Sequence, residues 1–418
     1  MTVLAARPAR IRAVLADRLV GGSLVMLVNT GVLAGFGLVF WTVAARLFTD
    51  QQVGAFPALV SGVNLLATVA AVGVPNLLIR YLKNSDDQRR LVAGSLAAVG
   101  GIGGLAAAAA VGVVAALHLR VFTVAAGALL LVIGFVVVTA VSAAVDAGLV
   151  AISQTVLLAK KNVVGGVLKV GLLFAGPALG AATLPVAYAT GAAVPVVIGL
   201  VALVRHTRPG TGPRPSGLRA RGRFSALNYA GTLFGILPST VVPIIVFAVA
   251  GPAPAAWFAV ASLPIGFLNF VPSVVSQVYF AQASATGERT ALVRRAAKLV
   301  FGLLTPAVAL LLAGAPYLMA VFGRQYVEHA TTAVRGLAIA SLCGAANYLV
   351  DATVIAADRV VAYVALNALN AALVLGLAAA LVGRGVGVLP LGLAAAQALS
   401  LLAGLGYLRL FPLGRPAR

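Results

Sequence analysis

The sequence is short of acidic residues. It contains nine Asp and Glu among 418 residues, against 30 Lys and Arg, and charged residues make up only 9% of the chain. Soluble domains carry about 25% charged residues, so this composition excludes an ordinary soluble fold. The shortage also leaves too few carboxylates for a membrane-bound glycosyl or prenyl-phosphate enzyme, which needs acids gathered at a cleft.

Cysteine and histidine are also scarce. The single cysteine, Cys343, lies within an apolar segment, so no disulfide framework is possible. His118, His206 and His329 fall in three separate expected loops, which leaves no cluster of metal ligands. The sequence contains no Walker-type phosphate loop and no nucleophile–base pair, so we expect neither enzymatic activity nor a cofactor.

Apolar sequence of helix length is abundant. Hydrophobic residues make up 61% of the chain, and its mean hydropathy is +1.07. A helix of about 20 residues crosses the hydrocarbon core of a bilayer. The sequence therefore predicts an all-α polytopic membrane protein with about twelve spans, at residues 20–45, 54–82, 91–116, 122–147, 163–181, 184–204, 226–250, 256–283, 297–322, 331–357, 360–382 and 388–409.

A basic segment divides these spans into two sets of six. Residues 205–225 hold six arginines, three prolines and no acid, and such a segment neither builds a core nor crosses a bilayer. We therefore expect an N-terminal six-helix bundle at residues 1–204, a cytoplasmic linker at 205–225 and a C-terminal six-helix bundle at 226–418.

Positive charge is distributed unequally between the expected loops. Cytoplasmic loops are enriched in Lys and Arg, so the side that holds more of them is expected to face the cytoplasm. This places the linker and both termini in the cytoplasm and explains most of the net charge of +21 by topology, without a nucleic-acid partner. The cations on that side are Lys83, Arg89, Arg90, Lys160, Lys161, the linker arginines, Arg289, Arg294, Arg295, Lys298, Arg359, Arg409, Arg415 and Arg418; the opposite side has Arg46, Arg120, Arg324 and Arg384.

Asparagines inside the expected spans are candidate functional residues, because polar groups at membrane depth are costly. Asn29 and Asn64 lie in the first two spans, and Asn228 and Asn269 lie in the corresponding spans of the second half. Their amides supply donors and acceptors that suit a sugar. The alternative is hydrogen bonding between helices, worth about 0.6 kcal/mol each.

Charged residues inside the spans are fewer. Arg80 and Lys169 are cations that could meet a phosphate, or could extend to the membrane interface. Asp351 is a candidate proton or cation site, or the partner of a neighbouring base, whereas we expect Asp146 to mark a helix end at the interface. Pro57, among other prolines within spans, frees a backbone carbonyl, which suits either a hinge or a static kink.

Several stretches resemble a known family. The opening FGLVFWTVAARLFTDQQVGAFPALVSGVNLLATVAAVGVPNLLIRYL is similar to the start of the bacterial polysaccharide exporter and oligosaccharide-lipid flippase family. That family belongs to the multidrug/oligosaccharidyl-lipid/polysaccharide (MOP) flippase superfamily. The matching features are Ala44–Leu47, Val53–Gly54, Gly73 and Leu78–Arg80, followed later by NYAGTLFGILPSTVVPIIV, VPSVVSQVYFAQAS and VFGRQYVEHA.

The resemblance implies two six-helix bundles around a central cavity that opens alternately to each face of the bacterial cytoplasmic (inner) membrane. The implied cargo is a polyprenyl-pyrophosphate-linked glycan, moved from the cytoplasmic to the outer leaflet while its lipid tail stays among membrane lipids. Glycosyltransferases or polymerases of the same pathway are implied partners. Arg46 and Arg80 match family cations and are carried over as substrate-binding residues.

Three alternatives remain open. A cation-coupled multidrug antiporter of the same superfamily needs an acidic ion site, for which Asp351 is the candidate, and the first span lacks the buried acid that such antiporters use. A lipid II-type flippase would lead us to expect several arginines in the first span, which are absent. A membrane scaffold recruited through the basic linker would need no transport at all.

Overall fold

The computed structural model describes residues 18–71, 73–116, 126–176, 182–210, 222–286 and 289–411. Every regular element in these ranges is a helix, and none of them contains a strand, which confirms the all-α class. The longer helices are α2 (Arg18–Leu47), α3 (Asp50–Ala71), α5 (Gln88–Ala116), α6 (Ala126–Ala151), α7 (Thr155–Gly171), α9 (Thr183–His206), α10 (Gly222–Ala250), α11 (Pro252–Thr286), α12 (Arg289–Ala320), α13 (Arg324–Ala356), α14 (Val360–Leu381) and α15 (Leu389–Leu410).

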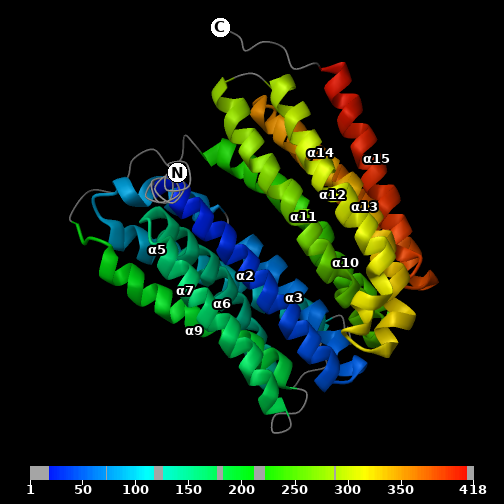
Figure 1. Cartoon of the computed structure of the whole chain (residues 1–418). Helices are drawn as coiled ribbons and strands as arrows, with labels where there is room; N and C mark the ends of the chain where they lie inside the picture. The colour runs from blue at the N-terminus through cyan, green and yellow to red at the C-terminus, as the bar shows by residue number, and fades with distance from the viewer. Residues whose placement is uncertain are drawn as a thin grey trace, which may run out of the picture. The chain divides into compact units, whose positions relative to one another are not determined.

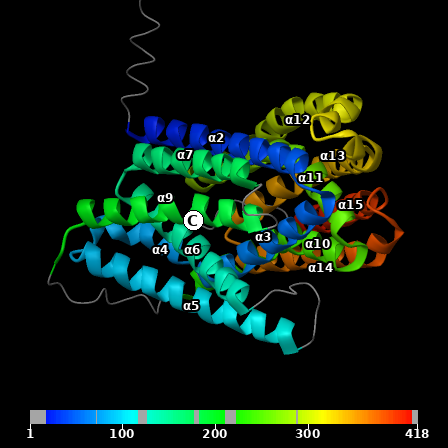
Figure 2. The same ribbon diagram turned by 90° about the horizontal axis from the view of Figure 1, so that it is seen from below.

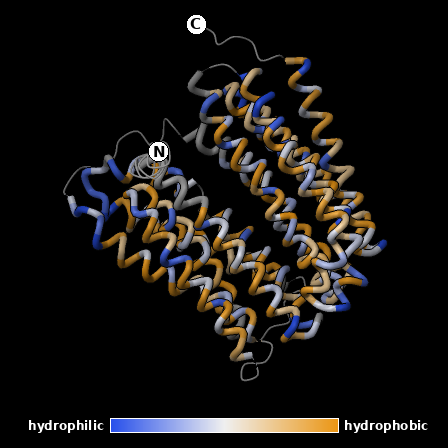
Figure 3. Tube along the Cα trace, viewed as in Figure 1, coloured by the Kyte–Doolittle hydropathy of each residue, from blue (hydrophilic) through white to orange (hydrophobic). Residues whose placement is uncertain are grey.

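Eleven helices in the described ranges are long and apolar enough to cross a membrane. The expected fifth span is shorter: α7 has 17 residues and continues into the 3-10 helix η3 (Leu172–Ala175). Figure 3 shows apolar residues along the helices and hydrophilic residues gathered toward helix ends. A polytopic membrane fold is therefore confirmed, whereas the side on which each loop lies stays a prediction.

The start of α7 corrects one expectation. We expected the fifth span to begin at residue 163, with Lys160 and Lys161 in a loop. The helix begins at Thr155, and the Lys161 side chain is 0% exposed. The expectation was wrong for Lys161, because a lysine can be buried in a helix once a carboxylate on another helix neutralises it.

At two points, a glycine in a left-handed conformation with a proline close after it separates consecutive helices. Gly73 adopts φ +75°, a left-handed conformation that glycine tolerates, and Pro75 then opens α4 (Val74–Tyr81). Gly251 adopts φ +90° and is followed by Pro252 at the start of α11. The expected second span is therefore two helices, α3 and α4, rather than one.

Contacts divide the chain into two compact units, each described by itself below. Unit 1 comprises Met1–Val43 and Leu66–Ser216, and unit 2 comprises Ala44–Leu65 and Gly217–Arg418. The helices of each unit are drawn in Figure 1. The division into two bundles and a linker at residues 205–225 stays a prediction of domain organisation.

Unit 1 is held together by close crossings of small residues. Helix α6 packs against α4, α5 and α9, and α7 packs against α9. A Cβ atom on Gly191 of α9 would lie 2.9 Å from the carbonyl oxygen of Gly165 on α7, so the two backbones touch. Phe36 of α2 packs on Gly166, which sets α2 alongside α7 (Figure 2). Such contacts replace the hydrophobic effect as the packing force between helices in lipid.

Unit 2 is built around α13, which packs against α11, α12 and α15. Helix α14 lies against α10 and α15 and completes the group (Figure 1). The turn between α2 and α3 also belongs to this unit. Gly54 of α3 lies against the backbone of Pro252, and Arg46 contacts the end of α12.

Candidate functional site

Lys169 on α7 lies among aromatic side chains of unit 1. Its Nζ atom is 3.7 Å from the ring centroid of Tyr188 on α9 and 4.8 Å from that of Phe40 on α2. Phe40 is fully buried, and its ring meets that of Tyr188 edge to face at a centroid distance of 5.7 Å. A desolvated cation gains about 2 kcal/mol from an aromatic face. Three helices therefore hold the ammonium group in place.

The charge of Lys169 has no acidic counterpart in the described part of unit 1. The ion pairs among the described residues join Lys161 to Asp146 and Arg324 to Glu328. A positive charge at membrane depth that no carboxylate neutralises favours an anionic ligand. Lys169 is thus a candidate contact for a phosphate or pyrophosphate group.

A chain of polar side chains links three helices of the same unit. The Nζ atom of Lys161 on α7 lies 2.6 Å from Oδ1 of Asp146 on α6 and donates to Oδ1 of Asn162 at 2.9 Å. Asn162 donates from Nδ2 to Oδ1 of Asn29 on α2 at 3.2 Å, and Asn29 is 9% exposed. Asp146 therefore lies inside α6 and forms an ion pair, which corrects the expectation that it marks a helix end.

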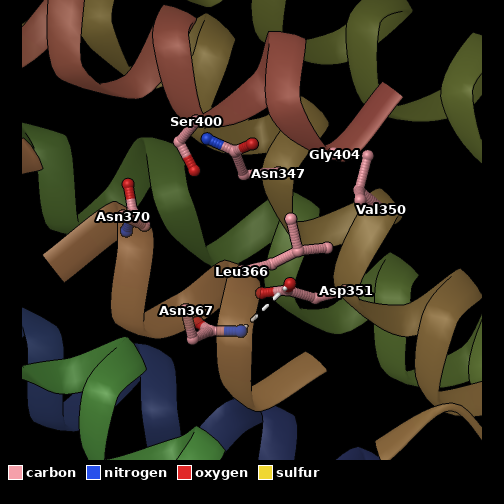
Figure 4. A pocket seen from close by; sticks show the side chains of 8 residues that line it. All are labelled: Asn347, Val350, Asp351, Leu366, Asn367, Asn370, Ser400 and Gly404. Carbon is pink, nitrogen blue, oxygen red and sulfur yellow. Dashed lines mark hydrogen bonds between the residues drawn. The ribbon is translucent and has the colours of Figure 1, made fainter. Parts of the chain in front are cut away.

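Unit 2 contains a small polar cavity between α13, α14 and α15. Its volume is about 20 Å³, and Figure 4 shows Asp351 of α13 and Asn367 of α14 pointing toward each other across it. Asn367 donates from Nδ2 to Oδ1 of Asp351 at 3.1 Å. About 10–15 Å³ suffices for one water, so this cavity accommodates a water or a small ion but no drug-sized molecule.

Further polar groups line the cavity. Asn347 of α13 donates from Nδ2 to Oε1 of Gln397 on α15 at 2.7 Å. Oδ1 of Asn370 is buried without a hydrogen-bond partner among the described residues, and Ser400 of α15 also borders the space (Figure 4). A carboxylate with amide and hydroxyl oxygens is a hard-oxygen ligand set, which suits a monovalent cation. The described residues contain no group of three His, Cys, Asp or Glu that could hold a metal.

Arg46 makes a defined structural contact. It donates from Nε to the carbonyl oxygen of Val321 at 2.9 Å and from Nη2 to that of Ala320 at 3.5 Å. These carbonyls lie at the C-terminal end of α12, where a cation complements the helix dipole. A substrate-binding role for Arg46 stays a prediction.

The other predicted site residues lie on four different helices. Asn64 of α3 is exposed and Asn269 of α11 is half-buried. Arg80 lies on α4 and Asn228 on α10, and both side chains fall outside the described residues. Asn29 joins the Asp146 network and Lys169 the aromatic cluster, so these two predicted residues have defined surroundings in unit 1.

Sequence analysis missed most of the cavity lining. Asn347 and Asp351 are four residues apart, as are Ser400 and Gly404, and Asn367 and Asn370 are three apart. Residues at these spacings share one face of a helix. Stripes of polar or small residues on three consecutive spans were therefore the available signal, and the selection of single charged residues and of other asparagines did not detect it.

The chain matches no protein-family model and no curated protein. Its structure is similar to a multidrug resistance MATE family transporter of the MOP superfamily in an inward-facing conformation, with TM-score 0.68, 15% identity and coverage of 90% of this chain and 93% of the other. It is also similar to the lipid II flippase MurJ in an inward closed conformation, with TM-score 0.68, 12% identity and coverage of 93% and 88%.

A third similar structure is a MOP superfamily transporter from Pyrococcus furiosus, with TM-score 0.65, 16% identity and coverage of 94% and 95%. The similarity extends over nearly the whole chain in all three cases, although the identities are low. The chain therefore has the polytopic helical fold of these two MOP-superfamily transporters and of this flippase.

Proposed function

We propose that this chain is a MOP-type membrane transporter that flips a lipid-linked oligosaccharide or polysaccharide precursor from the cytoplasmic to the outer leaflet of a bacterial inner membrane. The fold shared with transporters and a flippase supports the transport class. A pyrophosphate and its sugars do not cross hydrocarbon unaided, so a polar path is required. The protein does so without covalent chemistry, by alternating access.

The observation that carries this proposal is the uncompensated charge of Lys169. Its ammonium group lies on the rings of Tyr188 and Phe40, and among the described residues no acid pairs with it. Two unit charges 4 Å apart interact by about 4 kcal/mol at an effective dielectric constant of about 20. The sign of that interaction favours an anionic pyrophosphate headgroup and opposes a cationic drug.

One of the similar solved structures also draws attention to the sign of the charge in the binding pocket. The Pyrococcus furiosus transporter is described as having a reverse polarity of its binding pocket that suggests a different function. For this chain, we propose that Asn29, Asn64, Asn228 and Asn269 contact the sugars, with Arg46 and Arg80 as further cations for the phosphates. Lipid II is one member of the same chemical class, so a lipid II-type flippase is a special case of the proposal.

A cation-coupled multidrug antiporter is the second candidate function. The Asp351 cavity favours it, because a carboxylate and amide oxygens line a space of about 20 Å³. That volume suits a coupling ion and not a drug. We therefore assign Asp351 to ion coupling under either function. The two functions are distinguished by which substrate the protein transports.

The test is a leaflet assay in proteoliposomes with a fluorescent polyprenyl-pyrophosphate oligosaccharide. We expect protein-dependent transfer that falls at least about tenfold in Lys169→Met, which corresponds to about 1.4 kcal/mol. Lys169→Arg should retain most activity because it retains the charge. Lys160→Met is the matched control, since Lys160 is exposed on the same helix.

Two outcomes would contradict the proposal. If Lys169→Met and Arg80→Ala both transferred the glycolipid at the wild-type rate, neither cation would contact the substrate on its path. Absence of glycolipid transfer, together with proton- or sodium-linked efflux of organic cations that is lost in Asp351→Asn, would establish the antiporter instead.

A further inference from the structure

A fully buried lysine occupies an oxygen-lined position in unit 1. The Lys161 side chain is 0% exposed, and its Nζ atom lies 2.6 Å from Oδ1 of Asp146 and 2.9 Å from Oδ1 of Asn162. One carboxylate and one amide oxygen are therefore gathered around a single positive charge. A small monovalent cation takes the same class of oxygen ligand.

The surrounding helices are shaped to admit the lysine stem. A Cβ atom on Gly199 of α9 would lie 2.4 Å from Cγ1 of Val145 on α6 and 3.3 Å from Cδ of Lys161, so the glycine lets α9 pack closely against α6 and the lysine stem. Asn162 is in turn held by Asn29 of α2. Residues of α2, α6, α7 and α9 thus enclose one cation position.

The carboxylate also has an open side. The Asp146 side chain is 36% exposed, whereas its Oδ1 atom, which pairs with Lys161, is buried. The exposed area therefore lies on the rest of the side chain. A free cation could reach the carboxylate from that side if the lysine were absent.

We propose that unit 1 contains a cation-binding site whose resident cation is the ammonium group of Lys161, and that removal of this group opens the site to a free monovalent cation such as Na⁺ or methylammonium. Breaking a buried ion pair by removing one partner leaves an uncompensated charge, which is strongly unfavourable until a counterion replaces it. In the intact chain, unit 1 therefore needs no exchangeable ion at Asp146.

The test uses the purified full chain in detergent and measures thermal unfolding at equal concentrations of sodium, methylammonium or N-methylglucamine chloride. For Lys161→Ala, we expect a Tm higher by roughly 2 °C or more in sodium or methylammonium than in the bulky cation, because a ligand of the folded state raises its stability. The intact chain and the neighbouring Lys160→Ala variant should show no such difference. Lys161→Ala/Asp146→Asn should lose it.

Equal Tm values for Lys161→Ala in all three salts would overturn the proposal, as would a cation effect that persists in the double variant. If Lys161→Ala does not fold, Lys161→Met and Asp146→Asn provide a second test. Each single variant should lower Tm, and the neutral double variant should recover part of the loss. Strictly additive losses would also overturn the proposal. Stability is the readout, so the result does not depend on which substrate is transported.

Discussion

At the scale of single residues, Arg335 replaces a backbone hydrogen bond that a proline removes from the neighbouring helix α12. Its Nε atom, on α13, donates to the carbonyl oxygen of Leu312 on α12 at 2.9 Å. Leu312 lies four residues before Pro316, which lacks the N–H that would otherwise bond this carbonyl. The guanidinium group of Arg335 takes the place of that N–H as the donor to this carbonyl oxygen.

This contact predicts a specific coupling between two residues. Arg335→Met should lower the free energy of unfolding by about 1–3 kcal/mol, because it leaves the Leu312 carbonyl without a partner. In a Pro316→Ala background the same change should cost less, since the introduced alanine would supply the missing N–H. Denaturant unfolding of the four proteins in this cycle measures the coupling. If Arg335→Met lowered the free energy of unfolding equally in both backgrounds, Arg335 would not be replacing the hydrogen bond that Pro316 removes.

At the scale of elements, the crossing of α7 and α9 depends on glycine. Gly165 faces the carbonyl oxygen of Gly191 and the ring of Pro195, whose Cγ atom would lie 2.5 Å from an added Cβ. Because Pro195 has no N–H, the Gly191 carbonyl lacks its normal helical partner and is free to approach α7. This crossing also positions Lys169, whose Cβ atom would lie 2.7 Å from a Cβ atom on Gly191.

We therefore predict that Gly165→Ala destabilises unit 1 by about 1–3 kcal/mol, the usual cost of overpacking. Gly171→Ala is the matched control, because a Cβ atom there has no neighbour within 4 Å and alanine favours a helix more than glycine does. Thermal unfolding should separate the two variants, with Gly171→Ala equal to or above the parent protein. Equal behaviour of both variants would refute the close crossing.

At the scale of the whole molecule, charge asymmetry predicts the membrane orientation. Loops with many Lys and Arg stay in the cytoplasm. The first turn of α5 and the start of the linker are joined in unit 1, where Arg89 donates from Nε to the carbonyl oxygen of Thr207 at 3.2 Å. These two basic segments must therefore lie on one side of the membrane.

Cysteine accessibility tests this orientation. In a Cys343→Ser background, Gln51→Cys should react with an impermeant maleimide in intact cells, because Gln51 lies in the expected outer turn and is exposed. Asp86→Cys, which is also exposed, should react only after the membrane is permeabilised. The reverse pattern would invert the topology and place the basic linker outside.

Much of the fold could be predicted from the sequence. Within the described residues, each expected span corresponds to helical structure, since about 20 apolar residues are needed to cross the hydrocarbon core. The start of the expected fifth span, which corresponds to α7, was placed eight residues too late, because Lys160 and Lys161 resemble a polar loop. The candidate sites were only partly predicted. Lys169 and Asp351 were selected, whereas Asn367 was missed because it is a candidate only through its hydrogen bond to Asp351 on another helix.

The sequence by itself determined the helical class, the approximate positions of the helices and the excess of positive charge, because apolar length and charge are properties of each segment alone. Only the tertiary structure decided that Lys161 meets Asp146, that Lys169 lies on aromatic rings and that Arg335 bonds the carbonyl before a proline. These contacts depend on how each helix is rotated about its axis and which helix it packs against. Neither quantity is encoded in the composition of a single segment.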